Sequence, residues 1–454
     1  MIQKPQLTFW QLWNLSFGFF GVQIAYSLQS ANISRIFATL GADPHTLSFF
    51  WILPPLMGML VQPLVGKYSD RTWTRFGRRI PYLFLGSLIA IAVMCLLPNA
   101  GNFNLAFTWA MVFGLVALML LDTSINMAMQ PFKMLVGDMV NEEQKSKAYS
   151  IQSFLVNAGG IVGFLFPFIF AWIGIANEAP EGQVPDTVKY SFYIGAFILM
   201  LCVLYTTFKV KEMPPKEYAL FHGIDTTKTQ EKAPGMFTLL KKAPSAFWTV
   251  GIVQFFCWAA FLYMWTYSPG AIADLVWNTK DVKSAGYQTA GNWVGILFAV
   301  QSIGSVLWAL VIPKFKNIKT AYVVSLLLGA VGFASILLFG KTDMYMLVIS
   351  FGKTFTLDMG AQYMLIISFL LIGIAWAAML AIPFTLLTNS LSGEHIGTYL
   401  GLFNGTICLP QIVAAACGGL VLNLVGGLEA NMFLVAGAFL VLGAISVYFI
   451  KTKK

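Results

Sequence analysis

The stretch Met364–Leu391 reads MLIISFLLIGIAWAAMLAIPFTLLTNSL and decides the class of fold. It contains no Asp, Glu, Lys, Arg or His. A helix needs roughly 20 consecutive apolar residues to cross the hydrocarbon core of a bilayer, and its internal hydrogen bonds satisfy the backbone groups that lipid cannot. The stretch is therefore predicted to be a transmembrane helix.

The composition extends this interpretation to the whole chain. Of the 454 residues, 58% are hydrophobic and only 10% are charged, whereas soluble proteins carry about a quarter charged residues. These figures exclude a water-soluble globule, a disordered chain and a nucleic-acid-binding protein, despite the net charge of +9. The five cysteines all lie in apolar segments, so we interpret them as small core residues. No metal and no cofactor is predicted.

Comparable apolar segments recur along the chain. We expect an all-α polytopic membrane protein with about twelve transmembrane helices. The predicted segments are Phe9–Ser34, Leu47–Gly66, Tyr82–Leu97, Asn104–Val136, Ala148–Ile173, Tyr190–Phe208, Phe247–Ala271, Asn292–Pro313, Ala321–Phe339, Met364–Leu391, Gly397–Val425 and Met432–Ile450.

The pattern also indicates two pseudo-symmetric halves of six helices each. A stretch rich in proline and mixed charge, residues 209–246, is predicted to be a cytoplasmic linker between an N-terminal half, 1–208, and a C-terminal half, 247–454. One pattern recurs at equal spacing near the ends of the fourth and tenth segments. Met127, Pro131, Phe132, Leu135 and Glu142 correspond to Met379, Pro383, Phe384, Leu387 and Glu394. Such a repeat is typical of parallel-repeat transporters.

The basic residues predict the orientation in the membrane. Most of the 28 lysines and arginines fall in the loops of one side, which also holds both termini and the linker. The positive-inside rule places that side in the cytoplasm, so we expect a multi-pass protein of the cell inner (cytoplasmic) membrane. Residues Met1–Thr8 lead directly into the first segment without a signal-peptide pattern, and no cleavage is expected.

The fourth segment carries one ionisable residue well inside an apolar run. Asp122, Asn126, Gln130 and Lys133 recur at helical spacing and share one face. An acid at this depth costs several kcal/mol and is typical of functional sites. Without a fixed cation it can bind and release a proton. Asp122 is therefore the predicted proton-coupling and substrate-binding residue, and a purely structural carboxylate is the alternative.

Weaker polar and aromatic stripes accompany Asp122. Amides offer donors and acceptors and aromatic rings offer apolar faces, which together suit an uncharged, hydroxyl-rich ligand. The alternative for each single Gln or Asn is a hydrogen bond between packed helices. The residues at these spacings are Gln23, Tyr26, Ser30, Ser153, Asn157, Gln254, Trp258, Trp265, Asn404 and Gln411. Arg35 directly follows the first segment, at its predicted outer end.

The loop after the second segment adds a more specific pattern. It begins Gly66-Lys67-Tyr68-Ser69-Asp70-Arg71 and ends Arg75-Phe76-Gly77-Arg78-Arg79. These two parts resemble the cytoplasmic loop signature of the major facilitator superfamily. The resemblance implies that Asp70, Arg71, Arg75, Arg78 and Arg79 form a charge-assisted gating contact between helices.

Further stretches sharpen the resemblance. They are Gly21-Val22-Gln23, Leu28-Gln29, Pro44-His45 and Val61-Gln62-Pro63-Leu64-Val65-Gly66 near the start, then Leu121-Asp122 with Asn126, Pro131, Leu135 and Asp138, and finally Ile382-Pro383-Phe384, Asn404 and Pro410-Gln411-Ile412. Together they resemble the plant sucrose/proton symporters and their animal and bacterial glycoside-transporting relatives. That resemblance implies proton and sugar binding at Asp122, with His45 near the sugar entrance. Lys133 and Ile125 depart from the family pattern.

These observations predict a secondary active transporter that takes up a neutral disaccharide, a sucrose-like or maltose-like glycoside, together with a proton by alternating access. The expected partners are the sugar, the proton and the lipid bilayer, with no nucleic acid, and the chain is expected to be a monomer. A sodium-coupled or uncoupled sugar carrier is the alternative. A polytopic membrane enzyme is disfavoured, because His45, His222 and His395 lie in loops or at segment ends.

Overall fold

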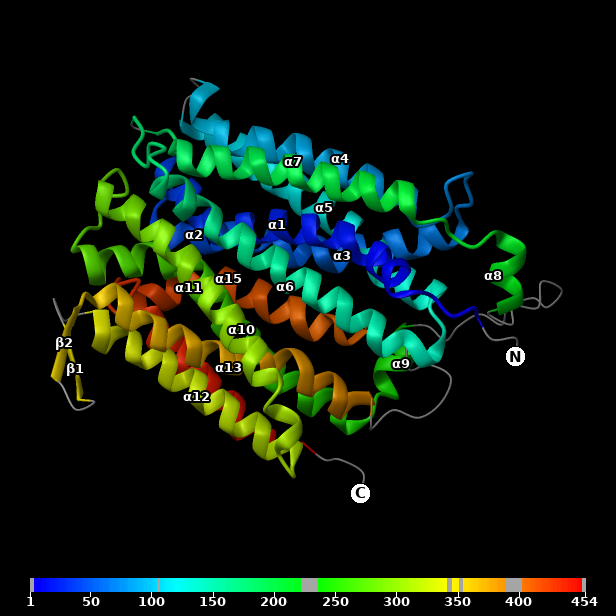
Figure 1. Cartoon of the computed structure of the whole chain (residues 1–454). Coiled ribbons are helices and arrows are strands. Elements are labelled where there is room, and N and C mark those ends of the chain that lie inside the picture. Colours follow the sequence, from blue (N-terminus) through cyan, green and yellow to red (C-terminus); the bar gives the residue numbers. More distant parts are fainter. Residues whose placement is uncertain are drawn as a thin grey trace. The chain divides into compact units, whose positions relative to one another are not determined.

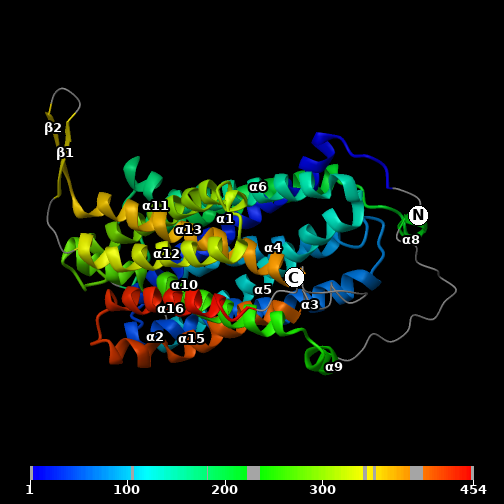
Figure 2. The same cartoon turned by 90° about the horizontal axis from the view of Figure 1, so that it is seen from below.

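A computed structural model describes residues 4–103, 107–180, 182–221, 236–340, 345–350, 354–388 and 402–450. Long helices dominate these residues (Figure 1), and the predicted all-α membrane fold is confirmed. The described residues add one antiparallel hairpin, in which β1 (Tyr345–Ser350) pairs with β2 (Thr354–Met359). Figure 2 shows this hairpin projecting beyond the ends of the neighbouring helices.

The helices lie on the predicted segments, except that two helices replace the single segment Leu47–Gly66 and several ends differ by a few residues. Before the linker they are α1 (Phe9–Thr39), α2 (Pro44–Phe50), α3 (Leu53–Arg71), α4 (Ile80–Leu96), the 3-10 helix η1 (Leu97–Phe103), α5 (Phe107–Met139), α6 (Glu142–Trp172), α7 (Asp186–Lys209) and α8 (Pro215–Phe221). After it they are α9 (Met236–Lys241), α10 (Ser245–Trp277), α11 (Ala285–Ala309), the 3-10 helix η2 (Ile312–Lys314), α12 (Ile318–Gly340), α13 (Ala361–Thr388), α15 (Gly405–Leu424) and α16 (Asn431–Val447).

Most of these helices can cross a membrane. Among the described residues, ten helical stretches are long and apolar enough to do so, and the shorter α16 is also apolar. Helix α1 is not among the ten, although it is 31 residues long. It carries polar side chains along its length, including Gln23, Gln29, Asn32 and Arg35, which lower its mean hydropathy.

The chain packs into two compact units, each with its own core. Unit 1 comprises Met1–Ser30, Leu56–Ile175 and Asp186–Pro234. Unit 2 comprises Ala31–Pro55, Ala176–Pro185 and Gly235–Lys454. The end of α1 and all of α2 therefore pack with the C-terminal helices. The two halves predicted from the sequence remain a prediction, and part of the predicted linker lies outside the described residues.

Glycines set the close helix packing within each unit. In unit 1, α4 lies beside α5 and α7 (Figure 1), and a Cβ at Gly86 would come within 2.9 Å of the Ala128 backbone nitrogen. In unit 2, a Cβ at Gly332 of α12 would come within 2.7 Å of the Ser368 carbonyl oxygen on α13. Small residues allow such approach, and van der Waals packing then holds the helices together without a hydrophobic driving force from lipid.

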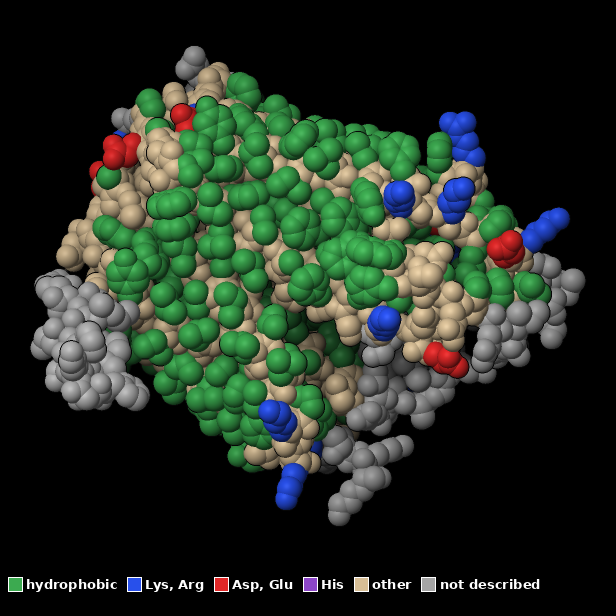
Figure 3. Space-filling model, in the orientation of Figure 1, with side chains coloured by type: hydrophobic (Ala, Val, Ile, Leu, Met, Phe, Trp, Pro, Cys, Tyr) green, Lys and Arg blue, Asp and Glu red, His purple; other side chains and the backbone are tan. Residues whose placement is uncertain are grey.

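The helices present apolar side chains outward. Trp172, Phe208 and Leu424 are 77–79% exposed. Figure 3 shows hydrophobic side chains covering the visible flanks of the helices, while Lys and Arg lie near helix ends. Exposed apolar surface on this scale is typical of contact with lipid. Together with the spanning helices it identifies a multi-pass membrane protein.

Candidate functional site

Asp122 is buried in the middle of α5 in unit 1. Its side chain is 1% exposed. The side-chain nitrogen Nε2 of Gln29, on α1, donates a hydrogen bond to Oδ1 of Asp122 at 2.5 Å. The other carboxyl oxygen, Oδ2, has no hydrogen-bond partner among the described residues. The acid is therefore held by a neutral amide.

The polar face predicted around Asp122 continues along α5 toward α3. Asn126 donates from Nδ2 to the Asp122 carbonyl oxygen at 2.9 Å, and Gln62 donates from Nε2 to Oδ1 of Asn126 at 2.7 Å. Gly58 leaves room for this amide, because a Cβ there would lie 3.4 Å from Oδ1 of Asn126. Helices α1, α3 and α5 thus supply one connected polar group within unit 1.

Three other candidates in unit 1, Gln23, Tyr26 and Asn157, have more local environments. Gln23 is half-buried against α6, where a Cβ built at Gly159 would lie 3.2 Å from the Cβ of Gln23. Asn157 donates to the carbonyl oxygen of Ser153 in its own helix at 2.8 Å. Tyr26 is half-buried one turn before Ser30, whose hydroxyl donates to the Tyr26 carbonyl oxygen. These side chains lie on the predicted stripes without a described hydrogen bond to Asp122.

An aromatic cluster surrounds Trp258 in unit 2. Its ring lies 5.6 Å from that of Trp376 and 6.4 Å from that of Trp265, measured between ring centroids. Trp51 stacks on Trp265 at 6.2 Å and donates from Nε1 to the hydroxyl of Ser34 at 2.9 Å. Trp258 is 8% exposed, and its indole Nε1 has no partner among the described residues. The cluster offers ring faces and one unused donor.

Of the remaining amides of unit 2, Gln254 fits the alternative of a hydrogen bond between helices, whereas Gln411 and Asn404 contact groups of α15 itself. Gln254 is fully buried and accepts a hydrogen bond from the hydroxyl of Tyr322, on α12, at 3.3 Å. Gln411 donates to the carbonyl oxygen of Ile407 in its own helix at 3.0 Å. Asn404 caps α15 and lies 3.7 Å from the sulfur of Cys408.

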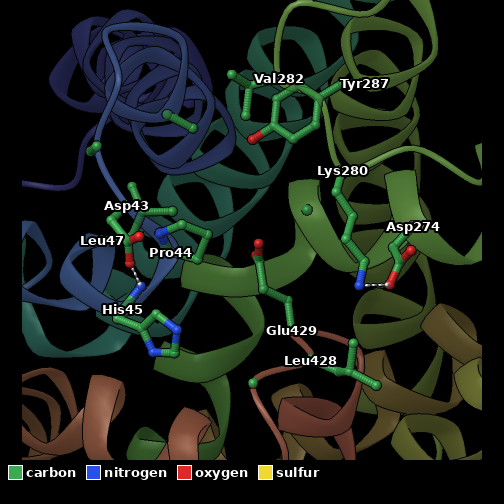
Figure 4. Close-up of a pocket in the computed structure, with 14 residues that line it drawn as sticks. Asp43, Pro44, His45, Leu47, Asp274, Lys280, Val282, Tyr287, Leu428 and Glu429 are labelled. Atoms are coloured by element: carbon green, nitrogen blue, oxygen red, sulfur yellow. Dashed lines mark hydrogen bonds and ion pairs between the residues drawn. The ribbon is translucent and has the colours of Figure 1, made fainter.

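His45 lies near the start of α2, at a pocket in unit 2 of about 220 Å³ (Figure 4). Its backbone N–H donates to the Asp43 carboxylate at 2.7 Å, and its ring nitrogen Nδ1 has no partner among the described residues. The role of His45 at a sugar entrance stays a prediction.

Arg35 is a buried cation whose partners the sequence did not indicate. It is 0% exposed in the last part of α1. Its guanidinium donates to Oε1 of Gln288 at 2.7 Å, to Oδ1 of Asn292 at 2.7 Å and to Oδ1 of Asn177 at 3.1 Å. A Cβ at Gly291 would lie 2.7 Å from Cδ of Arg35, so this glycine makes room for the side chain on α11. Its position at the predicted outer end of the first segment was the available signal.

The loop signature forms a charged cluster at the start of α4 in unit 1. Arg78 and Arg79 both donate to Oδ2 of Asp138, on α5, at 2.7 and 2.9 Å. Arg79 also donates to the hydroxyl of Ser69. The guanidinium carbon of Arg78 lies 3.8 Å from the centroid of the Tyr218 ring. This arrangement ties α3, α4, α5 and α8 together.

Glu212 completes the cluster. Its carboxylate accepts the backbone N–H groups of Arg78, Arg79 and Ile80 at 2.7–3.1 Å, which satisfies the free donors at the start of α4. Burial raises the pKa of Glu212, although these hydrogen bonds and the nearby Arg79 oppose the rise. Glu212 follows α7, so sequence spacing gave no signal for it.

The other predicted gating residues behave differently. Arg75 lies over the ring of Phe76, with 4.7 Å between its guanidinium carbon and the ring centroid. The side chains of Asp70 and Arg71 lie outside the described residues. The structure thus brings together Arg78 and Arg79 of the predicted set, and it adds Asp138, Glu212 and Tyr218.

A comparison of the sequence with models of known protein families agrees with the long apolar helices and the clustered loop signature. The family model described as Major Facilitator Superfamily matches residues 15–361 of the chain. The chain belongs to this superfamily. Its members are transporters, so the chain is a transporter rather than an enzyme, as predicted.

Individual relatives and solved structures agree with this assignment. The chain is 23% identical to the rice sucrose transport protein SUT1 over 95% of its own length and 86% of that protein. It is 24% identical to the rat proton-associated sugar transporter A, over 46% of this chain and 28% of that protein. A D-xylose-proton symporter structure superposes with a TM-score of 0.65 at 14% identity, over 97% of this chain and 96% of that one. The nucleoside transporter NupG superposes with a TM-score of 0.62 at 15% identity, over 98% and 99%.

Proposed function

We propose that this transporter takes up a neutral disaccharide, a sucrose-like or maltose-like glycoside, together with a proton. The observation that carries the proposal is Asp122, which is 1% exposed and hydrogen-bonded to the neutral amide of Gln29. A negative charge buried without a cation is costly, and a bound proton removes that charge. The relatives named as sucrose and proton-associated sugar transporters support this function.

The hydrogen bonds around Asp122 suggest how proton and sugar are coupled. When protonated, Asp122 carries an O–H donor at one carboxyl oxygen, while Gln29 still donates to the other. Oδ2, which has no partner among the described residues, is then available to a sugar hydroxyl. Loss of the proton removes that donor and leaves a buried charge, so proton release and sugar release favour one another.

One such carboxyl suffices energetically. A proton moving down a membrane potential of 100 mV releases about 2.3 kcal/mol. Because each 1.4 kcal/mol corresponds to a tenfold ratio, this supports sugar accumulation of roughly 50-fold. No second coupling ion is needed for uphill uptake on that scale.

Sugar recognition is proposed to use amide and aromatic groups rather than fixed cations. The unused indole donor of Trp258 and the faces of its aromatic cluster suit a sugar ring and its hydroxyls. Asn126 and Gln62 offer further amide groups in unit 1. The distribution of basic residues supports cytoplasmic termini in an inner membrane. We also propose that the transporter is a monomer.

Uptake into proteoliposomes tests the proposed function. Labelled disaccharides are offered with an inward proton gradient, with an inward sodium gradient, and with neither. The proposal predicts accumulation of at least one disaccharide above equilibrium only with the proton gradient. Accumulation driven by sodium alone, or equilibration unaffected by either gradient, would instead establish the sodium-coupled or uncoupled carrier.

A further inference from the structure

The pocket beside His45 contains more acidic groups than the proposed transport cycle uses. It lies in unit 2, where the end of α1 and the start of α2 pack near α10, α11 and the loop between α15 and α16. Figure 4 shows the side chains that surround it. Its ionisable lining residues are Asp43, His45, Asp274, Lys280, Tyr287 and Glu429.

Glu429 occupies a place that only a glycine neighbour allows. It lies between the end of α15 and the start of α16, and its carboxylate rests against Gly270 of α10. A Cβ at Gly270 would collide with both carboxyl oxygens of Glu429. Figure 4 shows the side chain directed into the pocket. Among the described residues, no hydrogen bond or ion pair reaches this carboxylate.

The neighbouring charges leave Glu429 without a cation of its own. Lys280 contributes the positive charge of the pocket lining, and its Nζ lies 3.7 Å from Oδ2 of Asp274. The Asp43 carboxylate is engaged as the N-cap of α2, where it accepts the backbone N–H of His45. Burial raises the pKa of Glu429 to about 8, the acids Asp274 and Asp43 add to the rise, and Lys280 opposes it.

A second group in the pocket is buried without a partner. Tyr287, on α11, is 3% exposed. The side chain of Tyr287 makes no hydrogen bond among the described residues, and Figure 4 shows its phenolic hydroxyl directed into the pocket. A hydroxyl that opens into the pocket gains free energy when it meets a donor or acceptor there. A protonated carboxyl, or a water bound to it, supplies both.

We propose that this pocket is a second proton-binding site, in which a proton on Glu429 keeps the loop between α15 and α16 seated against Gly270. The site is separate from Asp122, and it acts on the conformation of unit 2 rather than on the sugar. While Glu429 is neutral, the loop packs on α10. When the proton leaves, repulsion from Asp43 and Asp274 favours release of the loop.

The sign of the pH dependence follows from linkage. An acid binds its proton more tightly in the seated loop, and in the released loop it regains an ordinary glutamate pKa near 4.5. The population of the released loop relative to the seated loop therefore rises by up to about tenfold per pH unit above pH 4.5. This rise ends near pH 8. Below about pH 4.5 Glu429 is protonated in both the seated and the released loop, and above about pH 8 it is ionised in both.

Hydrogen exchange on the purified chain in lipid nanodiscs tests the proposal without any transport. The reporters are amides that close the loop, including Gly427 N–H, bonded to the Leu422 carbonyl oxygen at 2.9 Å, and Met432 N–H, bonded to that of Glu429 at 3.0 Å. Their opening constants, after division by the intrinsic exchange rate, should rise from pH 5.5 to about 8 and then level. A flat profile in the unmodified protein would overturn the proposal.

Four variants assign the effect to one group. Glu429→Gln should abolish the rise, because the amide cannot ionise. Gly270→Ala should abolish it as well, because the added methyl displaces the carboxylate into solvent. His45→Gln and the exposed control Glu178→Gln should leave it intact. A rise that survives Glu429→Gln, or that disappears in His45→Gln, would contradict the proposal.

Discussion

The charged cluster at the start of α4 makes the most quantitative prediction, through the substitution Asp138→Asn. Oδ2 of Asp138 accepts hydrogen bonds from Arg78 and Arg79 at 2.7 and 2.9 Å. The Asp138 side chain is 17% exposed, and those of the two arginines are 5% and 2% exposed. The amide keeps one acceptor oxygen but removes the negative charge that Asp138 presents to two largely buried guanidinium groups.

Charge-assisted hydrogen bonds are each worth about 1.5–3 kcal/mol, and removing one partner of a buried ion pair costs about 3–5 kcal/mol. Because Asp138 retains some solvent and the amide retains one hydrogen bond, we expect a loss of about 2–3 kcal/mol. A loss of that size changes the ratio of the conformations with and without the cluster by about 30-fold or more. The cluster lies far along α5 from Asp122, so the sugar contacts should persist.

The assay compares turnover with binding on the same preparation. Initial uptake in proteoliposomes should fall more than about tenfold, while the sugar dissociation constant, followed by tryptophan fluorescence, should change less than about threefold. Asp186→Asn is the matched control, since its carboxylate lies 3.5 Å from Lys189 and is 46% exposed. Because the Asp186 carboxylate is well solvated, this pair is expected to contribute about 0–1 kcal/mol. Lost binding with normal turnover in Asp138→Asn would refute the reasoning.

Three further predictions concern other parts of the structure. Gly291→Ala should lower thermal stability by about 1–3 kcal/mol, because its methyl group would displace the guanidinium of Arg35, and unchanged unfolding temperature would contradict this. Trp258→Phe should weaken sugar binding. It should also remove most of the protection that bound sugar gives to tryptophan fluorescence against an added quencher, whereas unaltered protection would exclude this ring from the site. Burial raises the pKa of Glu212, so the unmodified protein should lose stability as the pH rises above about 4.5 toward that raised pKa, and thermal melts of Glu212→Gln should lack this part of the pH dependence.

The helices could be predicted from the sequence because each must satisfy its backbone in lipid. The boundaries were harder where polar turns extend a helix beyond the apolar run. Helix α6 begins at Glu142 rather than at the predicted Ala148, since the Asn141 side chain accepts the N–H of Gln144 and caps an additional polar turn. Hydropathy alone gives no weight to such turns.

The candidate site was predictable only in part. Asp122 is a charged residue in an apolar run, which one helix is enough to reveal. Its partner Gln29 is distant in sequence, and the choice between Gln29 and the striped residues Gln23 and Ser30 depends on how α1 is rotated against α5. That rotation results from packing between helices and is not encoded in the periodicity of either one. The same holds for the three amides around Arg35.

The central claim is that Asp122 carries the coupled proton, and sugar-driven proton movement in Asp122→Asn tests it most directly. The amide keeps the shape of the carboxyl group and its hydrogen-bonding capacity, including an acceptor for Gln29, but it cannot ionise. The account predicts that adding sugar to cells carrying the variant no longer makes the medium alkaline, while exchange of external for internal sugar by counterflow continues. Alkalinisation and uphill accumulation at the level of the unmodified protein would show that Asp122 does not couple the proton to the sugar.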